Sequence, residues 1–504
     1  MRVAILLCSG LLALAAAREG PFKVYRVVPS TNRQLLKMIQ MFETATSEEA
    51  DFWHAPSTLN STIDIMVGPK HTESFERFLE EDDYIYHVAI KDLKKVLVEK
   101  ESFIDTKKTH LMFDRLHDDS TGTSKLKMGE YYSYQTLITW MERMAERVPG
   151  VSLVEIGKTV EGRRIAGLRF GEDDGRKKVV VIDAGIHARE WAAIHTGTYF
   201  INLMINDRDD PQIADYWKNL VVYIFPLLNP DGYEFTRGDK TNPRARMWRK
   251  SRSAKQCLFD GISNACCNGV DLNRNFAFRF AEVGASKYPC SEIYHGPTAF
   301  SEPETKAFRD FLTGLKGRVE AYITLHAYSQ LWIYSYSHRK FTYAPDIDET
   351  RRVAALAVAE LGKLYGTKYR YGTGPEIIYA FSGGSTDWAK ETLKIKYSYT
   401  IELRPTYEEF VDWNGFVLER SQLIPTAKET WAGVKVVLDE VSRQYKTSLL
   451  KRAETVKLQE EMCVDRLVAC KSWIEKNASL CRTSPQSMVR DCVKSCNLCH
   501  LIVV

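Results

Sequence analysis

The sequence predicts an α/β fold, a mixed-sheet sandwich, flanked by a small α+β domain and a disulfide-rich mini-domain. In residues 131–445, apolar strand-like runs alternate with helical stretches, a pattern typical of a largely parallel or mixed sheet. Residues 20–115 show short strands separated by helices, which suggests helices on one face of an antiparallel sheet. Residues 463–499 carry six cysteines, and so short a segment can bury little core without disulfides.

Composition and the first residues indicate an exported globular protein. The 504 residues are 44% hydrophobic and 27% charged, with a net charge of +4, a balance that favours neither nucleic acid nor a membrane surface as partner. Residues 1–17 combine Arg2, an apolar run and three alanines, as in a secretory signal peptide. No later stretch is apolar enough to span a bilayer. Removal of Cys8 with the signal peptide turns eleven cysteines into ten, an even number that fits an oxidising, extracellular compartment.

The N-terminal domain, residues 18–115, has its own apolar residues and no cluster of catalytic groups. We expect strands at 23–28, 63–67 and 84–90, and helices at 32–42 and 73–79. A polar segment without apolar periodicity lies between Lys107 and Glu130, and its residues 116–130 form the activation connector. Lys108, Arg115 and Lys125 are plausible targets there for a trypsin-like protease.

In the central domain we expect strands near Gly167 and at 179–182, 220–227, 321–325 and 397–402, and helices at 134–147, 190–206, 302–315, 350–364 and 420–444. Residues 446–462 form a charged linker to the cysteine-rich segment.

Candidate metal ligands follow the first buried strand. His187 and Glu190 come just past its carboxyl end, where open α/β sheets place ligands, and both groups can reach one Zn²⁺. His326 ends strand 321–325 and could share that edge, although a lone histidine at a strand end is more often structural. Glu402 points inward from strand 397–402, and a buried carboxylate needs a partner or a function. Three ligands with a further glutamate as general base make a hydrolytic site.

Several segments in order carry a specific resemblance: HARE, NPDGY, MWRKSRS, GVDLNRNF, HGPTAFSEPET, LHAYSQ, SGGSTDW and TIELR. Together they cover residues 131–445 and resemble the zinc metallocarboxypeptidases of the pancreatic A/B type. The N-terminal domain is similar to the pro-domain of that family, including DFW at residues 51–53. The resemblance implies that this domain inhibits the enzyme until a protease removes it.

The resemblance also implies a role for each matching residue. One Zn²⁺ would be held by His187, Glu190 and His326, with Asp271 orienting the first histidine. Glu402 would act as general base and acid, and Arg249 would stabilise the oxyanion. Residues implied to contact the peptide C-terminus are Asn273 and Arg274 at its carboxylate, the mobile Tyr379, and the accessory Arg189 and Tyr328.

One pocket residue separates the two main classes of that family, because an acid there selects C-terminal Lys or Arg. The matching residue is Thr386, which would leave a charged side chain desolvated without a partner. The resemblance therefore favours neutral aliphatic or aromatic residues, with Lys/Arg specificity as the alternative. Ser337 replaces the glycine usual in the A type. Phe381 stands where a small residue is common, and its ring either narrows the pocket or turns away.

The cysteines divide between the central domain and the C-terminal segment. Cys267–Cys290 matches the family's usual disulfide, and Cys257 and Cys266 remain to pair across an inserted loop, although Cys266 and Cys267 could exchange partners. The CxxxCxxC ending resembles the ShK-type domain of sea-anemone toxins, which implies the pairs Cys463–Cys499, Cys470–Cys492 and Cys481–Cys496. A zinc site is the competing interpretation, which export disfavours. Toxin activity does not follow, because Met488 and Val489 replace a Lys-Tyr pair.

The sequence thus predicts a secreted zymogen of a zinc carboxypeptidase acting on peptide C-termini. Asn60 and Asn477 lie in glycosylation sequons of such an exported protein. The alternative from another class is a non-catalytic protein that binds an unidentified partner through its ShK-type domain.

Overall fold

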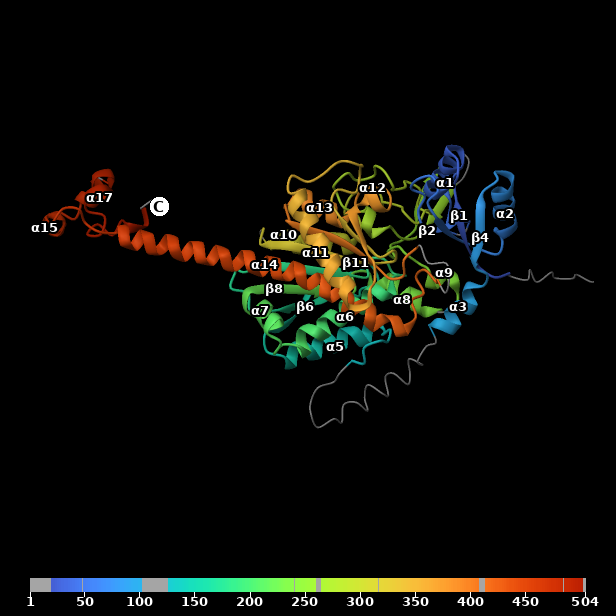
Figure 1. Ribbon diagram of the computed structural model, residues 1–504, viewed down its shortest axis with the longest axis horizontal. Helices are drawn as coiled ribbons and strands as arrows, with labels where there is room; N and C mark the ends of the chain where they lie inside the picture. The colour runs from blue at the N-terminus through green and yellow to red at the C-terminus, as the bar shows by residue number, and fades with distance from the viewer. Residues whose placement is uncertain are drawn as a thin grey trace, which may run out of the picture. The chain divides into compact units, whose positions relative to one another are not determined.

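The computed structural model describes residues 20–47, 49–101, 126–239, 241–259, 264–315, 317–407, 413–483 and 485–501 (Figure 1). The predicted signal peptide and the candidate cleavage sites Lys108, Arg115 and Lys125 lie outside these residues, as does most of the connector. The chain divides into two compact units between residues 438 and 439. No described helix has the length and apolar character of a transmembrane segment.

The N-terminal domain is a four-stranded antiparallel sheet in the order β2-β3-β1-β4. Its elements are β1 (Lys23–Val28), α1 (Asn32–Thr44), β2 (Asp51–His54), β3 (Ile63–Val67), α2 (Thr72–Glu81), β4 (Ile85–Ile90) and α3 (Leu93–Lys100). Met38 of α1 and Leu79 of α2 pack against Tyr25 and Ile65 of the sheet, so the apolar stripes of both helices close one core. The α+β prediction is confirmed, and β2 and α3 are additional elements.

The central domain contains an eight-stranded mixed sheet in the order β13-β12-β14-β11-β7-β8-β6-β5. Its strands are β5 (Val151–Lys158), β6 (Arg164–Phe170), β7 (Lys178–Ala184), β8 (Leu220–Phe225), β11 (Val319–Ala327), β12 (Leu331–Tyr334), β13 (Arg370–Thr373) and β14 (Tyr397–Leu403). The four central strands β14, β11, β7 and β8 are parallel, and antiparallel pairs flank them. The mixed-sheet prediction is confirmed.

Helices cover both faces of this sheet, with α10 and α13 above it and α5, α6 and α7 below it in Figure 1. The helices are α5 (Tyr134–Arg147), α6 (Trp191–Asn206), α7 (Pro211–Asn219), α8 (Pro230–Gly238), α9 (Pro243–Arg246), α10 (Pro303–Gly314), α11 (Ile347–Tyr365), α12 (Gly374–Ile377), α13 (Ser385–Leu393) and α14 (Arg420–Met462). Strands buried on both faces explain the continuous apolar runs such as Val179–Ile182. The predicted linker 446–462 is helical and continues α14.

Five disulfides form, two in the central domain and three in the C-terminal unit. A hairpin of β9 (Gln256–Phe259) and β10 (Asn264–Cys267) places Cys257 opposite Cys266, and these two residues are bonded. Cys267 bonds Cys290. The C-terminal unit contains α15 (Cys470–Lys476), α16 (Leu480–Thr483), α17 (Pro485–Asp491) and η3 (Cys499–Leu501), joined by Cys463–Cys499, Cys470–Cys492 and Cys481–Cys496. These are the five pairs expected from the sequence.

One buried acid of the central domain makes its stability depend on pH. Glu304 in the first turn of α10 is 2% exposed, and neither carboxylate oxygen has a hydrogen-bond partner among the described residues. Burial raises the pKa of Glu304 from 4.5 to about 8, and the nearby carboxylates of Glu302 and Asp231 add to the rise. The folded chain therefore keeps a proton at Glu304 that the unfolded chain releases in this pH range.

We expect Glu304→Gln to reduce the loss of stability between about pH 4.5 and pH 8. In that window the folded state binds more protons than the unfolded state, so stability falls as pH rises, whereas glutamine is neutral throughout. The thermal midpoint of the variant, relative to the native chain, should rise from pH 5 to pH 8. A difference between the two chains that stays constant over this range would contradict the protonated state of Glu304.

Candidate active site

Three predicted ligands converge at the carboxyl edge of the sheet. His187 follows β7, Glu190 precedes α6, and His326 lies in β11, which pairs directly with β7. Glu190 Oε1 lies 2.7 Å from His187 Nδ1, and Glu190 Oε2 lies 3.0 Å from His326 Nδ1. One ligand atom from each residue lies within 4.8 Å of the other two, and all three side chains are buried. This arrangement can hold one metal ion.

The chemistry of these three groups fits Zn²⁺. The two Nδ1 atoms lie 3.1 Å apart and face the same carboxylate, so a cation between them would satisfy all three groups. Burial and the Arg249 guanidinium lower the pKa of His187, which favours the neutral imidazole that binds metals. Burial opposes a charge on His326, yet the Glu190 carboxylate outweighs it and raises the pKa of His326. The Glu190 carboxylate thus favours a positive charge beside it.

Asp271 fixes the orientation of the first histidine. Its Oδ1 lies 3.1 Å from His187 Nε2, which leaves Nδ1 of His187 directed at the metal position. Its Oδ2 accepts hydrogen bonds of 3.0 and 2.9 Å from Arg249 Nε and Nη2. Although burial opposes ionisation, Arg249 and Arg274 hold the pKa of Asp271 well below its usual range. A charged Asp271 therefore positions both His187 and Arg249.

Glu402 lies beside the metal position on the neighbouring strand. In the parallel pairing of β11 with β14, Glu402 is the register partner of His326, and both residues line one cavity. Burial raises the pKa of Glu402, and the nearby Glu190 carboxylate adds to this, while His326 and Arg249 oppose it. A carboxylate of this kind can exchange a proton with a reacting group in the cavity.

The predicted carboxylate-binding residues lie on the same cavity. Asn273 and Arg274 belong to the short helix η2 (Leu272–Arg274), which Asp271 caps through the Asn273 backbone N–H at 3.0 Å. Arg274 Nη2 donates to the Tyr379 hydroxyl at 3.0 Å, and its Nε donates to the Gly284 carbonyl at 2.7 Å. Thr386 is not among the residues that line this cavity, but its hydroxyl lies 3.2 Å from that of Thr400, which does line it.

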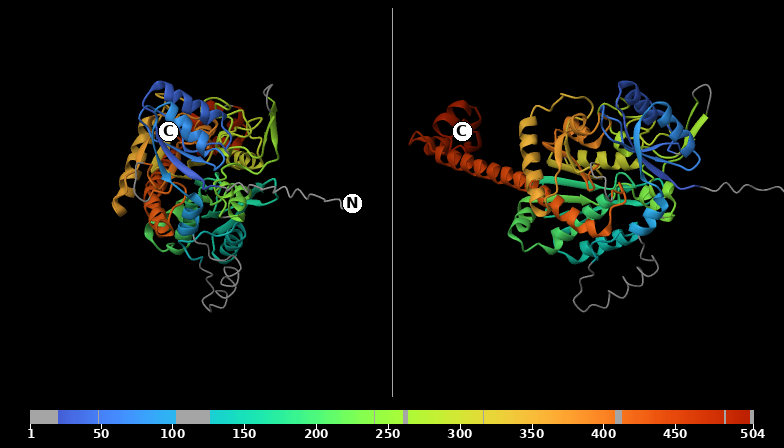
Figure 2. Two further views of the ribbon diagram at one scale, coloured as in Figure 1. Left: turned by 90° about the vertical axis from the view of Figure 1, so that its right-hand side faces the viewer. Right: turned by 45° about the vertical axis from the view of Figure 1, so that its right-hand side comes forward.

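The N-terminal domain occupies the remaining predicted substrate contacts. Arg189 Nη1 lies 2.8 and 2.9 Å from the two carboxylate oxygens of Asp51 in β2, and both side chains are almost fully buried. The Tyr328 hydroxyl donates to Asp64 Oδ2 of β3 at 2.8 Å. Figure 2 shows this domain, in blue, packed against the central domain. Neither carboxylate was predicted from the sequence to make these contacts, although the DFW segment includes Asp51.

A second buried ion pair joins the two domains beside α9. Arg246 donates from Nε and Nη2 to the Glu101 carboxylate at 2.7 and 2.6 Å, and both side chains are 0% exposed. The Arg246 guanidinium also lies 3.8 Å from the centroid of the Trp191 ring. Glu101 is the last described residue before the connector. The sequence contained no signal for this pair, whose members are 145 positions apart.

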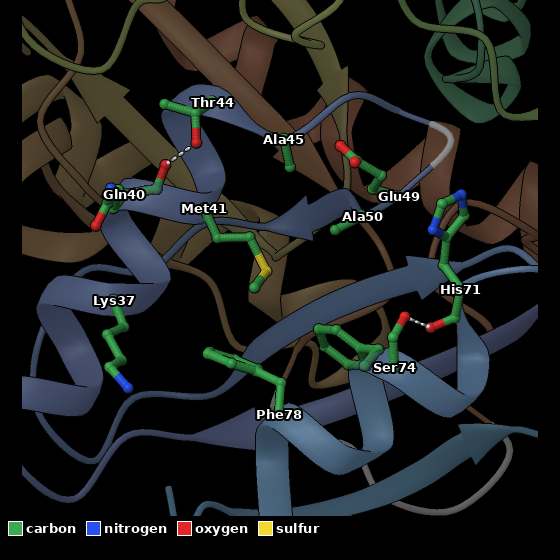
Figure 3. Close-up of a pocket in the computed structure, with 11 residues that line it drawn as sticks. Lys37, Gln40, Met41, Thr44, Ala45, Glu49, Ala50, His71, Ser74 and Phe78 are labelled. Atoms are coloured by element: carbon green, nitrogen blue, oxygen red, sulfur yellow. Dashed lines mark hydrogen bonds between the residues drawn. The ribbon is translucent and has the colours of Figure 1, made fainter. Parts of the chain in front are cut away.

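The cavity at the metal position is small and partly enclosed. It measures about 50 Å³ and is lined by the metal ligands, Glu402, Arg274 and Phe381, with Trp53 and His54 contributed by the N-terminal domain. A larger pocket of about 540 Å³ opens between α1 and α2, where Met41 and Phe78 point inward (Figure 3). The lining of that pocket comes from the N-terminal domain alone, so we assign the chemistry to the smaller cavity.

The fold and site define a metal-dependent hydrolase whose cavity is covered by its own N-terminal domain. The chain belongs to the zinc carboxypeptidase family: the family model described as "Zinc carboxypeptidase" matches residues 137–433, and that described as "Carboxypeptidase activation peptide" matches residues 25–100.

Relatives of both types are similar to the chain. Carboxypeptidase A2 of Mus musculus is 36% identical over 421 residues, covering 83% of this chain and 93% of the relative. Carboxypeptidase B of Rattus norvegicus is 35% identical over 439 residues, covering 85% and 97%. The crystal structure of carboxypeptidase A from Helicoverpa armigera matches with a TM-score of 0.69 and 27% identity, covering 84% of this chain and 98% of that one.

Proposed function

We propose that the chain is a secreted precursor of an exopeptidase that removes neutral C-terminal residues from peptides. One observation carries the proposal: His187, Glu190 and His326 share one cavity with Glu402 and with the carboxylate-binding pair Asn273 and Arg274. A metal position, a base and a cationic anchor within one cavity suit cleavage of the bond next to a free carboxylate.

Arg274 directs the reaction to the C-terminal residue of the substrate. In the precursor, Arg274 Nη2 donates to the Tyr379 hydroxyl. Once Tyr379 moves away, the Arg274 guanidinium and the Asn273 amide bind the substrate carboxylate. A peptide lacking a free carboxylate forfeits this contact and leaves Arg274 with the more distant carboxylate of Asp271, whose Oδ2 lies 3.9 Å from Nη1. The enzyme therefore acts on the last residue only.

The remaining residues have distinct roles at the scissile bond. A Zn²⁺ held by His187, Glu190 and His326 supplies Lewis acidity when bound. Glu402 accepts the proton of the attacking water and donates it to the leaving amine. Arg249 is held by Asp271 through Nε and Nη2, and its Nη1, 3.8 Å from Glu190 Oε1, can donate to the developing oxyanion, where a fixed positive charge favours the transition state.

The N-terminal domain keeps the precursor inactive by occupying substrate contacts. Asp51 neutralises Arg189 and Asp64 engages Tyr328, so neither residue can bind a peptide while the domain is in place. Trp53 and His54 line the cavity itself and exclude substrate from it. Cleavage in the connector by a trypsin-like protease begins activation, which requires this domain to leave.

The C-terminal segment is an accessory ShK-type binding module of the secreted enzyme. Its three disulfides fix a small unit with few buried apolar residues, as expected for a protein matured in an oxidising compartment. The sequon residues Asn60 and Asn477 are both exposed, as glycosylation requires. A channel-blocking role does not follow, because Met488 is buried within this unit.

We expect peptidase activity only after trypsin treatment, and faster on blocked dipeptides ending in neutral residues than on one ending in Arg. Without an acid at Thr386, a buried arginine side chain lacks a partner, which slows its removal roughly 10²–10³-fold. Hydrolysis of substrates ending in Ala, Phe and Arg, before and after trypsin, measures this.

A chelator control, followed by readdition of Zn²⁺, identifies metal-dependent cleavage in the same assay. Preference for Arg would refute the assignment based on Thr386 and leave the zinc chemistry intact. Absence of cleavage on every substrate, with zinc bound, would instead favour a non-catalytic protein that binds through its C-terminal module.

A further inference from the structure

Phe381 lies in the wall of the cavity, in the segment that joins α12 to α13. Its side chain is 6% exposed and lines the cavity together with Ile333, Thr400 and the metal ligands. The backbone N–H of Phe381 donates to the Ser337 carbonyl at 2.8 Å, which fixes the start of the side chain. The ring is thus directed into the cavity.

Two glycines, which have no side chain, provide the space that the Phe381 ring occupies. A Cβ at Gly374 would lie 3.1 Å from Phe381 Cε1, and a Cβ at Gly384 would lie 2.9 Å from Cε2 on the other side. Gly384 has φ −79°, which any residue adopts, so the backbone there does not require glycine. The ring, and not the local conformation, accounts for the missing side chain, and it is held between the two glycines.

The ring lies beside the groups that bind the substrate carboxylate. The Arg274 guanidinium is 4.8 Å from the ring centroid, and the Tyr379 ring centroid is 5.7 Å away. The terminal carboxylate and the terminal side chain of a peptide branch from the same carbon atom. A side chain whose carboxylate is bound by Arg274 must therefore enter the space next to Phe381.

The ring leaves little space there for a large side chain. With the N-terminal domain in place and the Tyr379 hydroxyl on Arg274, the whole cavity measures about 50 Å³, whereas a benzene molecule occupies a cavity of about 150 Å³. Loss of the N-terminal domain opens the cavity beside Trp53 and His54. It leaves Phe381 in place, because the ring is held by Gly374, Gly384 and Arg274 of the peptidase domain.

We propose that Phe381, seated between Gly374 and Gly384, restricts the enzyme to small neutral C-terminal residues: glycine, alanine and serine. The inference rests on the proposed function and narrows its substrate class. Phe381 determines specificity by volume, whereas Thr386 determines it by the absence of charge. Aromatic and large aliphatic residues are disfavoured because their side chains and the Phe381 ring require the same space.

The test uses the trypsin-activated full-length chain and blocked dipeptides ending in Ala, Leu or Phe. The native enzyme should show a kcat/KM for Ala at least about tenfold above that for Phe, and Phe381→Ala should reverse the order, chiefly through a lower KM for Phe. Phe280→Ala is the matched control, because Phe280 packs on His295 away from the cavity and should leave the order unchanged.

If Phe381→Ala fails to fold, the substrate preference of the native enzyme still decides the proposal. Phe381→Leu is a milder variant, for which we expect an intermediate ratio of the kcat/KM values for Ala and Phe. A native preference for Phe or Leu over Ala would overturn the role of Phe381 while leaving the carboxypeptidase assignment standing. Lack of cleavage of all three substrates after trypsin treatment would overturn the proposed function itself, so the two failures are distinct.

Discussion

Replacing Glu402 by glutamine is expected to lower kcat roughly 10²–10⁴-fold while the chain still binds one Zn²⁺. The substitution keeps the shape of the side chain and removes its ability to accept a proton beside the metal position. Because Glu402 is the register partner of His326 and not a member of the ligand cluster, metal binding should persist. A large loss of turnover with little change in KM is the expected pattern, since a proton acceptor acts in the transition state.

Steady-state kinetics of the trypsin-activated enzyme, with zinc content measured on the same sample, test this expectation. Glu304→Gln serves as the matched control, because it makes the same change at a buried glutamate of the peptidase domain that does not line the cavity. Turnover within a factor of a few of the native value in Glu402→Gln would show that another group transfers the proton.

Replacing Asp51 by alanine is expected to give the uncleaved precursor measurable peptidase activity. The Asp51–Arg189 pair is almost fully buried, and removal of one partner from such a pair costs about 3–5 kcal/mol, because the other charge stays buried alone. The closed arrangement of the N-terminal domain carries this cost, and the open arrangement, with Arg189 in water, does not. Opening should therefore become about 10²–10³-fold more frequent.

Activity of the untreated chain relative to the trypsin-treated chain measures the opening. Asp82→Ala is the matched control, because Asp82 pairs with Lys37 within the N-terminal domain. This variant of the precursor should stay inactive before trypsin treatment. If Asp51→Ala is as inactive as the native precursor before trypsin and as active after it, the Asp51–Arg189 pair has no part in inhibition.

Most of the fold followed from apolar patterns, and the exceptions have physical reasons. The four-residue strand β2 contains the buried polar residues Asp51 and His54, which contact Arg189 and Tyr407 of the peptidase domain. Residues 446–462 are highly charged and were expected to form a linker. They are rich in Lys, Glu and Leu, strong helix formers, and they extend a helix that is already nucleated.

The site was predicted through the resemblance, and the structure adds the distances and orientations that residue spacing in the sequence does not give. His187 and His326 are 139 positions apart, and only the pairing of β7 with β11 brings them together. The orientation of Phe381 was left open by the sequence. The two flanking glycines determine it, and their relevance appears only when the loop is folded. The buried pair of Glu101 and Arg246 likewise depends on tertiary contact alone.

The position of Glu101, the last described residue before the connector, affects how the precursor responds to cleavage. A cut beyond residue 101 removes the covalent tether, but leaves the Glu101–Arg246 and Asp51–Arg189 pairs intact. The severed domain then behaves as a separate inhibitor, and the fraction of enzyme that it occupies depends on its concentration and no longer on a linker. We expect the activity of freshly cut enzyme to rise on dilution, so cleavage starts activation and dissociation completes it.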